Sequence, residues 1–197
     1  MPVTINGTTG VVTPGATIGS INGILKSSSG VVSQAVAGQD YGQLILETAQ
    51  TASGTAVDFT GIPSWVKRIT IMFAGVSLSG ASSFLIQVGT SSGIVSTGYS
   101  GGGTRYGGAA IASASGTNGI SPWNITASAA YSGLAIWTLV GGNIWTCSLN
   151  FGASGGIESG GIAGGSLTLS GTLDRVRITT VNGTDTFDAG TINISYE

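Results

Sequence analysis

Carboxylates are the main candidates for chemistry in this chain, because its 197 residues include no histidine. Without histidine, neither a Ser-His-Asp nor a Cys-His arrangement can form, and histidine-based metal sites are excluded as well. Two carboxylates at a suitable separation can still hydrolyse a glycosidic bond. The candidates for that role are Asp58, Glu158, Asp174, Asp185 and Asp188. None of them lies in a recognisable catalytic motif, so we do not expect an enzyme.

Asp185 and Asp188 follow closely after the dipeptide Asn182-Gly183. Carboxylates in turns usually accept hydrogen bonds from nearby backbone groups, and we expect that role here. A calcium site on this pair stays open as an alternative, because hard cations prefer oxygen ligands on loops. The single Cys147 allows neither a thiolate cluster nor an intrachain disulfide. No cofactor is expected, since Gly101-Gly102-Gly103 lacks the following Lys-Ser or Lys-Thr of a phosphate-binding loop.

The stretch from Gly98 to Gly108 contains two tyrosines and one arginine among many glycines. So much glycine predicts a loop rather than a strand, and loops on a rigid scaffold often carry binding groups. The tyrosines can stack on sugar rings, and the arginine can bind an acidic sugar through its planar guanidinium. In a second irregular segment, Trp123 is either exposed for binding or buried in the core. The predicted receptor-binding residues are Tyr99, Arg105, Tyr106 and Trp123.

The composition is typical of an all-β protein. The chain has 35 glycines, a hydrophobic fraction of 41% and a charged fraction of 7%, against about 25% charged residues in ordinary globular proteins. Short runs of Val, Ile, Thr and aromatic residues alternate with Gly-rich turns, which predicts an antiparallel, jelly-roll-like β-sandwich. Six scattered basic residues give no patch for nucleic acid. No apolar run approaches the ~20 residues of a membrane-spanning helix, so no membrane insertion is expected.

The stretch from Val57 to Leu78 organises the predicted sandwich. After a turn set by Pro63, apolar residues alternate with polar ones and should face the core. These inward residues are Ile69, Ile71 and Phe73. The run from Phe84 to Gly89 is expected to be the antiparallel partner of this strand, with Gln87 pointing outward.

Two hairpins are expected in the C-terminal half. One joins the runs 134–140 and 143–151 through Gly141-Gly142-Asn143, and the other joins 175–180 to 191–196 through Asn182-Gly183. Trp137 and Trp145 lie on the two arms of the first hairpin. Both should pack in the core or between subunits rather than bind a ligand.

Residues 1–42 differ from residues 43–197, which we expect to form the β-sandwich. The N-terminal part is rich in Gly, Ser and Thr. We expect it to be an extended attachment or shaft segment, with a flexible tail as the alternative. In it, Ile-Asn-Gly followed by Gly-Val-Val occurs twice, starting at Ile5 and at Ile21. Such short units cannot bury a face alone, but three chains around one axis can supply the missing partners. Few charges protect the strand edges, so a homotrimer is expected.

Three stretches resemble the distal or receptor-binding domains of bacteriophage tail fibres: Phe59-Thr60-Gly61-Ile62-Pro63, Val66-Lys67-Arg68-Ile69-Thr70 and the ending 186–197. The resemblance covers roughly residues 43–197, and residues 30–41 resemble the linkers that precede such domains. It implies a structural virion protein of the tail, assembled in the host cytoplasm. Its N-terminal segment would bind other tail or baseplate proteins, and its C-terminal domain a host-surface glycan or protein. A purely structural fibre or capsid-decorating protein, and a polysaccharide depolymerase, stay open as alternatives.

Overall fold

The computed structural model describes residues 23–29, 31–36, 40–107, 110–122, 127, 129–155 and 159–197. Within these residues every regular element is a β-strand, and all the strand pairs are antiparallel. The predicted fold class, an all-β antiparallel sandwich, is confirmed. The chain divides into two compact units, with the boundary between Gly42 and Gln43.

The N-terminal unit contains a small hairpin of β1 (Leu25–Ser28) and β2 (Val31–Gln34). Asp40 fastens its base: the carboxylate accepts a hydrogen bond from the backbone N–H of Val36 and forms an ion pair with Lys26 at 2.9 Å. The Val36 N–H and the Lys26 ammonium together lower the pKa of Asp40. Large apolar side chains are exposed on the hairpin, namely Ile24, Leu25, Val32 and Val36. A two-stranded hairpin of this kind is marginal by itself.

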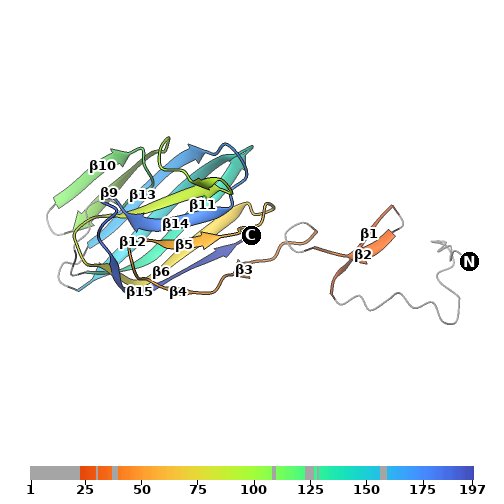
Figure 1. The fold of residues 1–197 in the computed structure, drawn as a ribbon, viewed down its shortest axis with the longest axis horizontal. Coiled ribbons are helices and arrows are strands. Elements are labelled where there is room, and N and C mark those ends of the chain that lie inside the picture. Colours follow the sequence, from red (N-terminus) through yellow and green to blue (C-terminus); the bar gives the residue numbers. More distant parts are fainter. Residues whose placement is uncertain are drawn as a thin grey trace, which may run out of the picture. The chain divides into compact units, whose positions relative to one another are not determined.

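The C-terminal unit is a sandwich of one large and one small sheet (Figure 1). Among the described residues, the large sheet runs in the order β10 (Ala110–Gly116), β9 (Ser100–Gly107), β13 (Ser159–Thr168), β12 (Ile144–Ser154), β11 (Ala130–Gly141), β6 (Arg68–Leu78), β15 (Phe187–Tyr196), with β3 (Ile45–Leu46) and β4 (Gln50–Thr51) both paired to β15. The small sheet runs β5 (Val57–Thr60), β14 (Arg175–Thr180), β7 (Phe84–Thr90), β8 (Gly93–Ile94).

One hydrophobic core lies between the two sheets. Ile69, Ile71 and Phe73 of β6 are buried on its inner face, as their alternation predicts. Phe84 of the small sheet packs against aromatic rings of the large one, with ring centroids 5.5 Å from Phe151 and 6.0 Å from Phe73. These edge-on and tilted contacts fix the two layers against each other.

The expected pairing between the central strand and residues 84–89 is wrong. Strand β6 pairs with β11 and β15 in the large sheet, whereas β7 pairs with β14 and β8 in the small sheet. Gln87 does not point to solvent either. Its side chain is 7% exposed and donates a 2.7 Å hydrogen bond from Nε2 to the backbone oxygen of Asn118. Both faces of β7 are covered, so alternation does not separate an inside from an outside there.

Of the two expected hairpins, one is confirmed. Strands β11 and β12 pair through the turn at Gly142, which has φ +55°. Asn182-Gly183 does form a tight turn, with the Gly183 N–H bonded to the Thr180 oxygen at 3.1 Å. However, β14 before the turn belongs to the small sheet and β15 after it to the large one. The turn is therefore a crossing between layers, because local turn chemistry does not determine which sheet the next strand joins.

The segment 119–122 covers the part of the large sheet over β9 and β13. Ile120 exchanges two backbone hydrogen bonds of 2.9 Å with Ile86 of β7. It lies so close to the large sheet that a Cβ at Gly101 would be 2.8 Å from its Cδ1 atom. A Cβ at Gly103 would be 2.2 Å from the backbone oxygen of Ser121. The glycines of β9 thus allow the two layers to approach each other.

The expectation that residues 98–108 form a loop is also wrong. Ser100–Gly107 is strand β9, paired on one side with β10 and on the other with β13. Glycine weakens a strand in isolation, but two ladders of backbone hydrogen bonds hold this one. The close approach of the segment 119–122 is the reason for the glycine content on its inner face.

We predict that Gly103→Ala destabilises the protein by about 1 to 3 kcal/mol, because the added methyl collides with backbone and not with a flexible side-chain tip. Gly152→Ala is the matched control on the same sheet. A Cβ there meets nothing within 4 Å, so the change should stay within about 0.5 kcal/mol of zero. Urea unfolding of both variants measures the difference. Equal free energies of unfolding would contradict the close packing of the segment 119–122 on β9.

Candidate functional site

Tyr99, one of the four predicted binding residues, lies in the core. It is 2% exposed, and its hydroxyl accepts a 2.8 Å hydrogen bond from the Val88 N–H and donates one of 2.9 Å to the Val95 oxygen. Its ring contacts Trp137 edge-on at 6.3 Å. Burial raises the pKa of Tyr99. The prediction that Tyr99 binds a receptor is therefore corrected: the side chain bridges the sheets.

Arg105 and Tyr106 are neighbours on β9 and therefore point to opposite faces of the large sheet. Arg105 shares the inner side with Gly103 and is half-buried. Tyr106 lies on the outer face and is 47% exposed. Trp123 lies outside the described residues. The structure thus does not bring the predicted residues together. Of the described ones, Tyr99, Arg105 and Tyr106, it is Tyr106 alone that lies on the outer face of the large sheet.

The Tyr106 side chain rests on the neighbouring strand β13. Gly160 is its register partner, and a Cβ at Gly160 would lie 2.5 Å from the Tyr106 hydroxyl and 2.6 Å from Cζ. Gly152 on β12 is the next residue in this row, and it leaves open space above the backbone. The Tyr106 ring thus lies over Gly160 and stays exposed to solvent.

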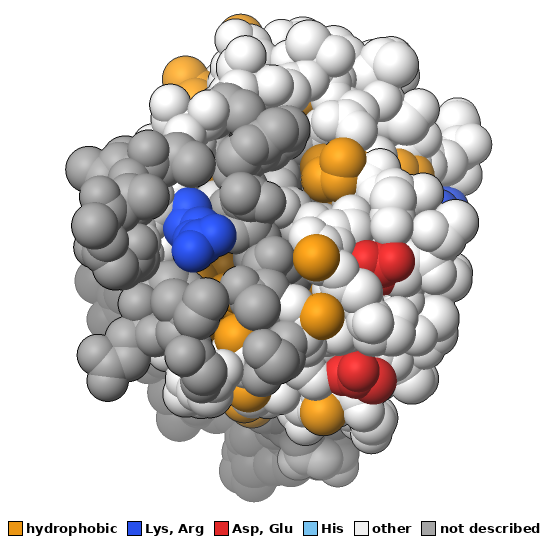
Figure 2. Space-filling model, turned by 90° about the vertical axis from the view of Figure 1, so that its left-hand side faces the viewer, with side chains coloured by type: hydrophobic (Ala, Val, Ile, Leu, Met, Phe, Trp, Pro, Cys, Tyr) orange, Lys and Arg blue, Asp and Glu red, His pale blue; other side chains and the backbone are white. Residues whose placement is uncertain are grey.

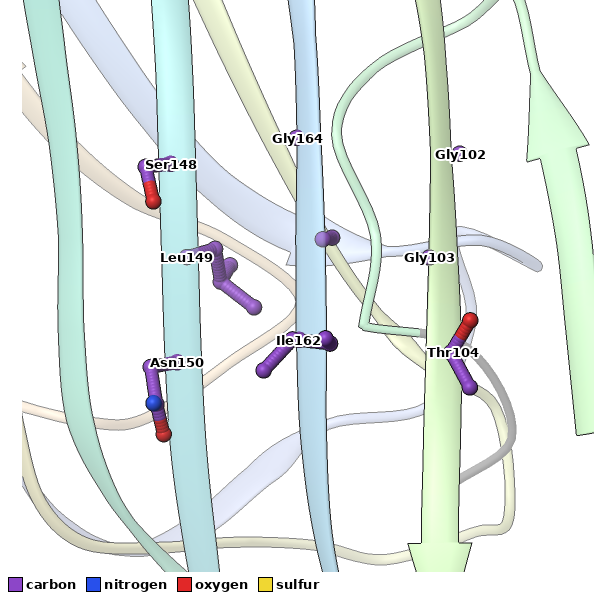
Figure 3. A pocket seen from close by; sticks show the side chains of 9 residues that line it. Gly102, Gly103, Thr104, Ser148, Leu149, Asn150, Ile162 and Gly164 are labelled. Atoms are coloured by element: carbon purple, nitrogen blue, oxygen red, sulfur yellow. The ribbon is translucent and has the colours of Figure 1, made fainter. Parts of the chain in front are cut away.

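A hollow of about 350 Å³ lies on the same outer face, over β12, β13 and β9 (Figure 3). Its floor is formed where Gly164 and Gly102, which are register partners, have no side chains. Ile162 stands between Asn150 on one neighbouring strand and Thr104 on the other. The full lining is Gly102, Gly103, Thr104, Ser148, Leu149, Asn150, Ile162, Ala163 and Gly164.

Tyr106 and this hollow form one continuous surface, which we call the outer-face site. Tyr106 and Thr104 are two residues apart on β9, so they project from the same face about 7 Å from each other. Ile162 and Gly160 have the same relation on β13. The ring is therefore next to the edge of the hollow formed by Thr104 and Ile162, and the floor at Gly102 and Gly164 lies one row further along the strands.

The outer-face site is uncharged. No residue that lines the hollow is ionisable, and the hydroxyls of Ser148 and Thr104 and the amide of Asn150 make no hydrogen bond within the described chain. In the view of Figure 2, the described surface shows a few acidic and basic side chains among mostly uncharged ones. Such a site can exchange hydrogen bonds with a neutral polar ligand and cover its apolar parts.

The described carboxylates are all engaged in hydrogen bonds or ion pairs. Asp58 binds Arg177 through two contacts of 2.8 and 2.7 Å, which raises the pKa of Arg177. Glu47 accepts from the Tyr196 hydroxyl, and burial together with this contact raises the pKa of Tyr196 to about 12. The remaining pairs are Asp40 with Lys26, Asp174 with Arg175, Asp188 with Ser77, and Glu197 with Arg68.

Asp185 stabilises its turn, but the backbone N–H groups of the turn, those of Thr184 and Asp185, bond to the Asn182 side-chain oxygen. The Asp185 carboxylate accepts hydrogen bonds from the Asn182 side-chain amide at 2.8 Å and from the Ser82 N–H at 2.9 Å, and these lower its pKa. Asp188 instead accepts from the Ser77 hydroxyl. In the described part of the chain, no cluster of three or more His, Cys, Asp or Glu side chains is placed to hold a metal ion. Glu158 lies outside that part.

Trp137 and Trp145 are buried in the core, as expected. Cys147 is the register partner of Trp137 and is also buried, which raises the pKa of its thiol. Because it is buried, the thiol is shielded from reagents in solution. These side chains stabilise the sandwich and do not reach the outer-face site.

No protein-family model matches the chain, and neither the curated proteins nor the solved structures include a significant match. Among the described residues, no helix is long and apolar enough to cross a membrane.

Proposed function

We propose that this chain is a structural virion protein, a bacteriophage tail fibre that binds a glycan on the host cell surface with its C-terminal sandwich. The N-terminal segment attaches to other tail or baseplate proteins, and the protein belongs to the tail of a virion assembled in the host cytoplasm. The observation that carries the glycan part is the exposed Tyr106 ring beside an uncharged hollow. The phage part is supported by the sequence resemblance alone.

The chemistry of the outer-face site suits a sugar. A pyranose has an apolar face of C–H groups that packs on an aromatic ring, and Tyr106 offers such a ring. Its hydroxyls need neutral donors and acceptors, which Ser148, Asn150 and Thr104 supply. The hollow is open rather than enclosed, so a polymer can enter without its ends being threaded.

The proposal is for a binding protein and not for an enzyme or a cofactor-dependent protein. Most glycoside hydrolases place two carboxyl groups on either side of the bond that they hydrolyse. The outer-face site has none, and the described carboxylates elsewhere are engaged in ion pairs or hydrogen bonds. This supports receptor binding over a polysaccharide depolymerase.

A homotrimer is part of the proposal. The hairpin of β1 and β2 exposes large apolar side chains such as Leu25 and Val32, which three copies can bury against one another. Three linked sites also make a weak individual affinity sufficient. We expect native mass spectrometry to show a trimer at micromolar concentration, and a monomer there would contradict this part.

A purely structural fibre or capsid-decorating protein is the second candidate. Leu134, Ile144 and Ile162 are exposed on strands of the large sheet, and such side chains also suit contact with another virion protein. In that case the protein would bind no cells, and Tyr106 would have no role in adsorption.

We predict that Tyr106→Ala weakens adsorption of the labelled protein to host cells by roughly fivefold or more, because it removes the stacking surface. Tyr106→Phe keeps the ring and should retain most of the binding. Neither variant should lower the melting temperature measured by circular dichroism by more than a few degrees, since the side chain is half exposed. Unchanged adsorption by a folded Tyr106→Ala variant would contradict the proposed role of Tyr106, and absence of adsorption by the wild type would favour the structural candidate.

A further inference from the structure

The outer-face site contains an apolar group and an amide side by side. Ile162 is 49% exposed, and Asn150 is its direct register partner on β12. The side chains of such partners on one face lie about 5 Å apart. Figure 3 shows both at the hollow, with the floor between β13 and β9 left free by Gly164 and Gly102.

The polar and apolar groups beside the hollow are open to a ligand. The Asn150 amide has a carbonyl acceptor and an NH₂ donor, and neither is hydrogen-bonded within the described chain. Ser148 is two residues away on the same strand and adds a hydroxyl on the same side of the hollow. The Ile162 side chain presents apolar surface to solvent.

From this juxtaposition we infer that the edge of the hollow formed by Ile162 and Asn150 binds the acetamido group of a neutral N-acetylated sugar, whose ring stacks on Tyr106. This inference rests on the proposed glycan-binding function and names its ligand class. The acetamido group combines a methyl with an amide, which match the apolar surface of Ile162 and the amide of Asn150. An amide meeting an amide can both donate and accept, so the two groups satisfy each other.

The size and the charge of the site agree with this ligand. The row of Tyr106 and Gly160 lies about 7 Å from the row of Thr104, Ile162 and Asn150, because the rows are two residues apart along the strands. A sugar ring over the first row can therefore place a substituent at the second. Arg105 lies on the opposite face of β9, so the expected contact of this arginine with an acidic sugar does not belong to this site.

The test compares two N-acetylated sugars with their unsubstituted counterparts. The probes are the methyl glycosides of N-acetylglucosamine, N-acetylgalactosamine, glucose and galactose, titrated into the full chain at millimolar concentration and followed by nuclear magnetic resonance. We expect the N-acetylated pair to bind about tenfold more tightly, which is the effect of one amide hydrogen-bond pair and one buried methyl.

Two variants test whether Asn150 causes the preference for the N-acetylated glycosides. Asn150→Ala should reduce the preference for the N-acetylated pair to about twofold or less, since the amide partner is gone while Tyr106 remains. Thr138→Ala is the control, because Thr138 is exposed on β11 outside the hollow, and it should leave the tenfold preference unchanged.

The results distinguish failure of the acetamido inference from failure of the proposed glycan-binding function. Equal affinity for all four glycosides would overturn the acetamido inference and leave glycan binding intact. A preference that survives Asn150→Ala would overturn the assignment to the hollow. Binding of none of the glycosides would overturn the inference as well, whereas the proposed function fails only if the wild-type protein also does not adsorb to cells.

Discussion

The close approach between the segment 119–122 and the large sheet is the constraint on which the rest of the sandwich depends. The small sheet has four described strands against nine in the large one, so part of the large sheet needs another cover. Ile120 gives that cover by pairing with β7 and lying on β9 and β13. Backbone can lie this near only where side chains are absent, which explains Gly101, Gly103 and Gly165 on the inner face.

Strands β9 and β13 also carry glycines on their outer face, and these glycines form the outer-face site. Gly102 and Gly164 face outward and leave the hollow, and Gly160 makes room for the Tyr106 side chain to lie on the sheet. Because glycines occur on both faces, β9 and β13 carry few side chains. The side chains that remain on the outer face are an aromatic ring, an isoleucine and neutral polar groups, and this set suits a neutral sugar better than an ion or a reacting group.

Sequence reasoning succeeds where the signal is local and fails where it depends on pairing. The burial of Ile69, Ile71 and Phe73 follows from alternation, and the turn at Gly142 from its residue types. Glycine propensity predicts a loop for residues 98–108, because it ignores the two ladders of hydrogen bonds that hold β9. Tyr106 is a candidate from its residue type, whereas Asn150 and Ile162 are placed near it only by the register of three strands, which no single stretch encodes.

The central claim is that recognition takes place on the outer face of β9, β12 and β13. Its most direct test is mapping of resonance shifts in the full chain when a surface polysaccharide is added from a bacterium to which the protein adsorbs. We expect the largest shifts in residues 102–106, 148–152 and 160–164. Shifts confined to β5 and β14 of the small sheet, with these three stretches unchanged, would contradict it.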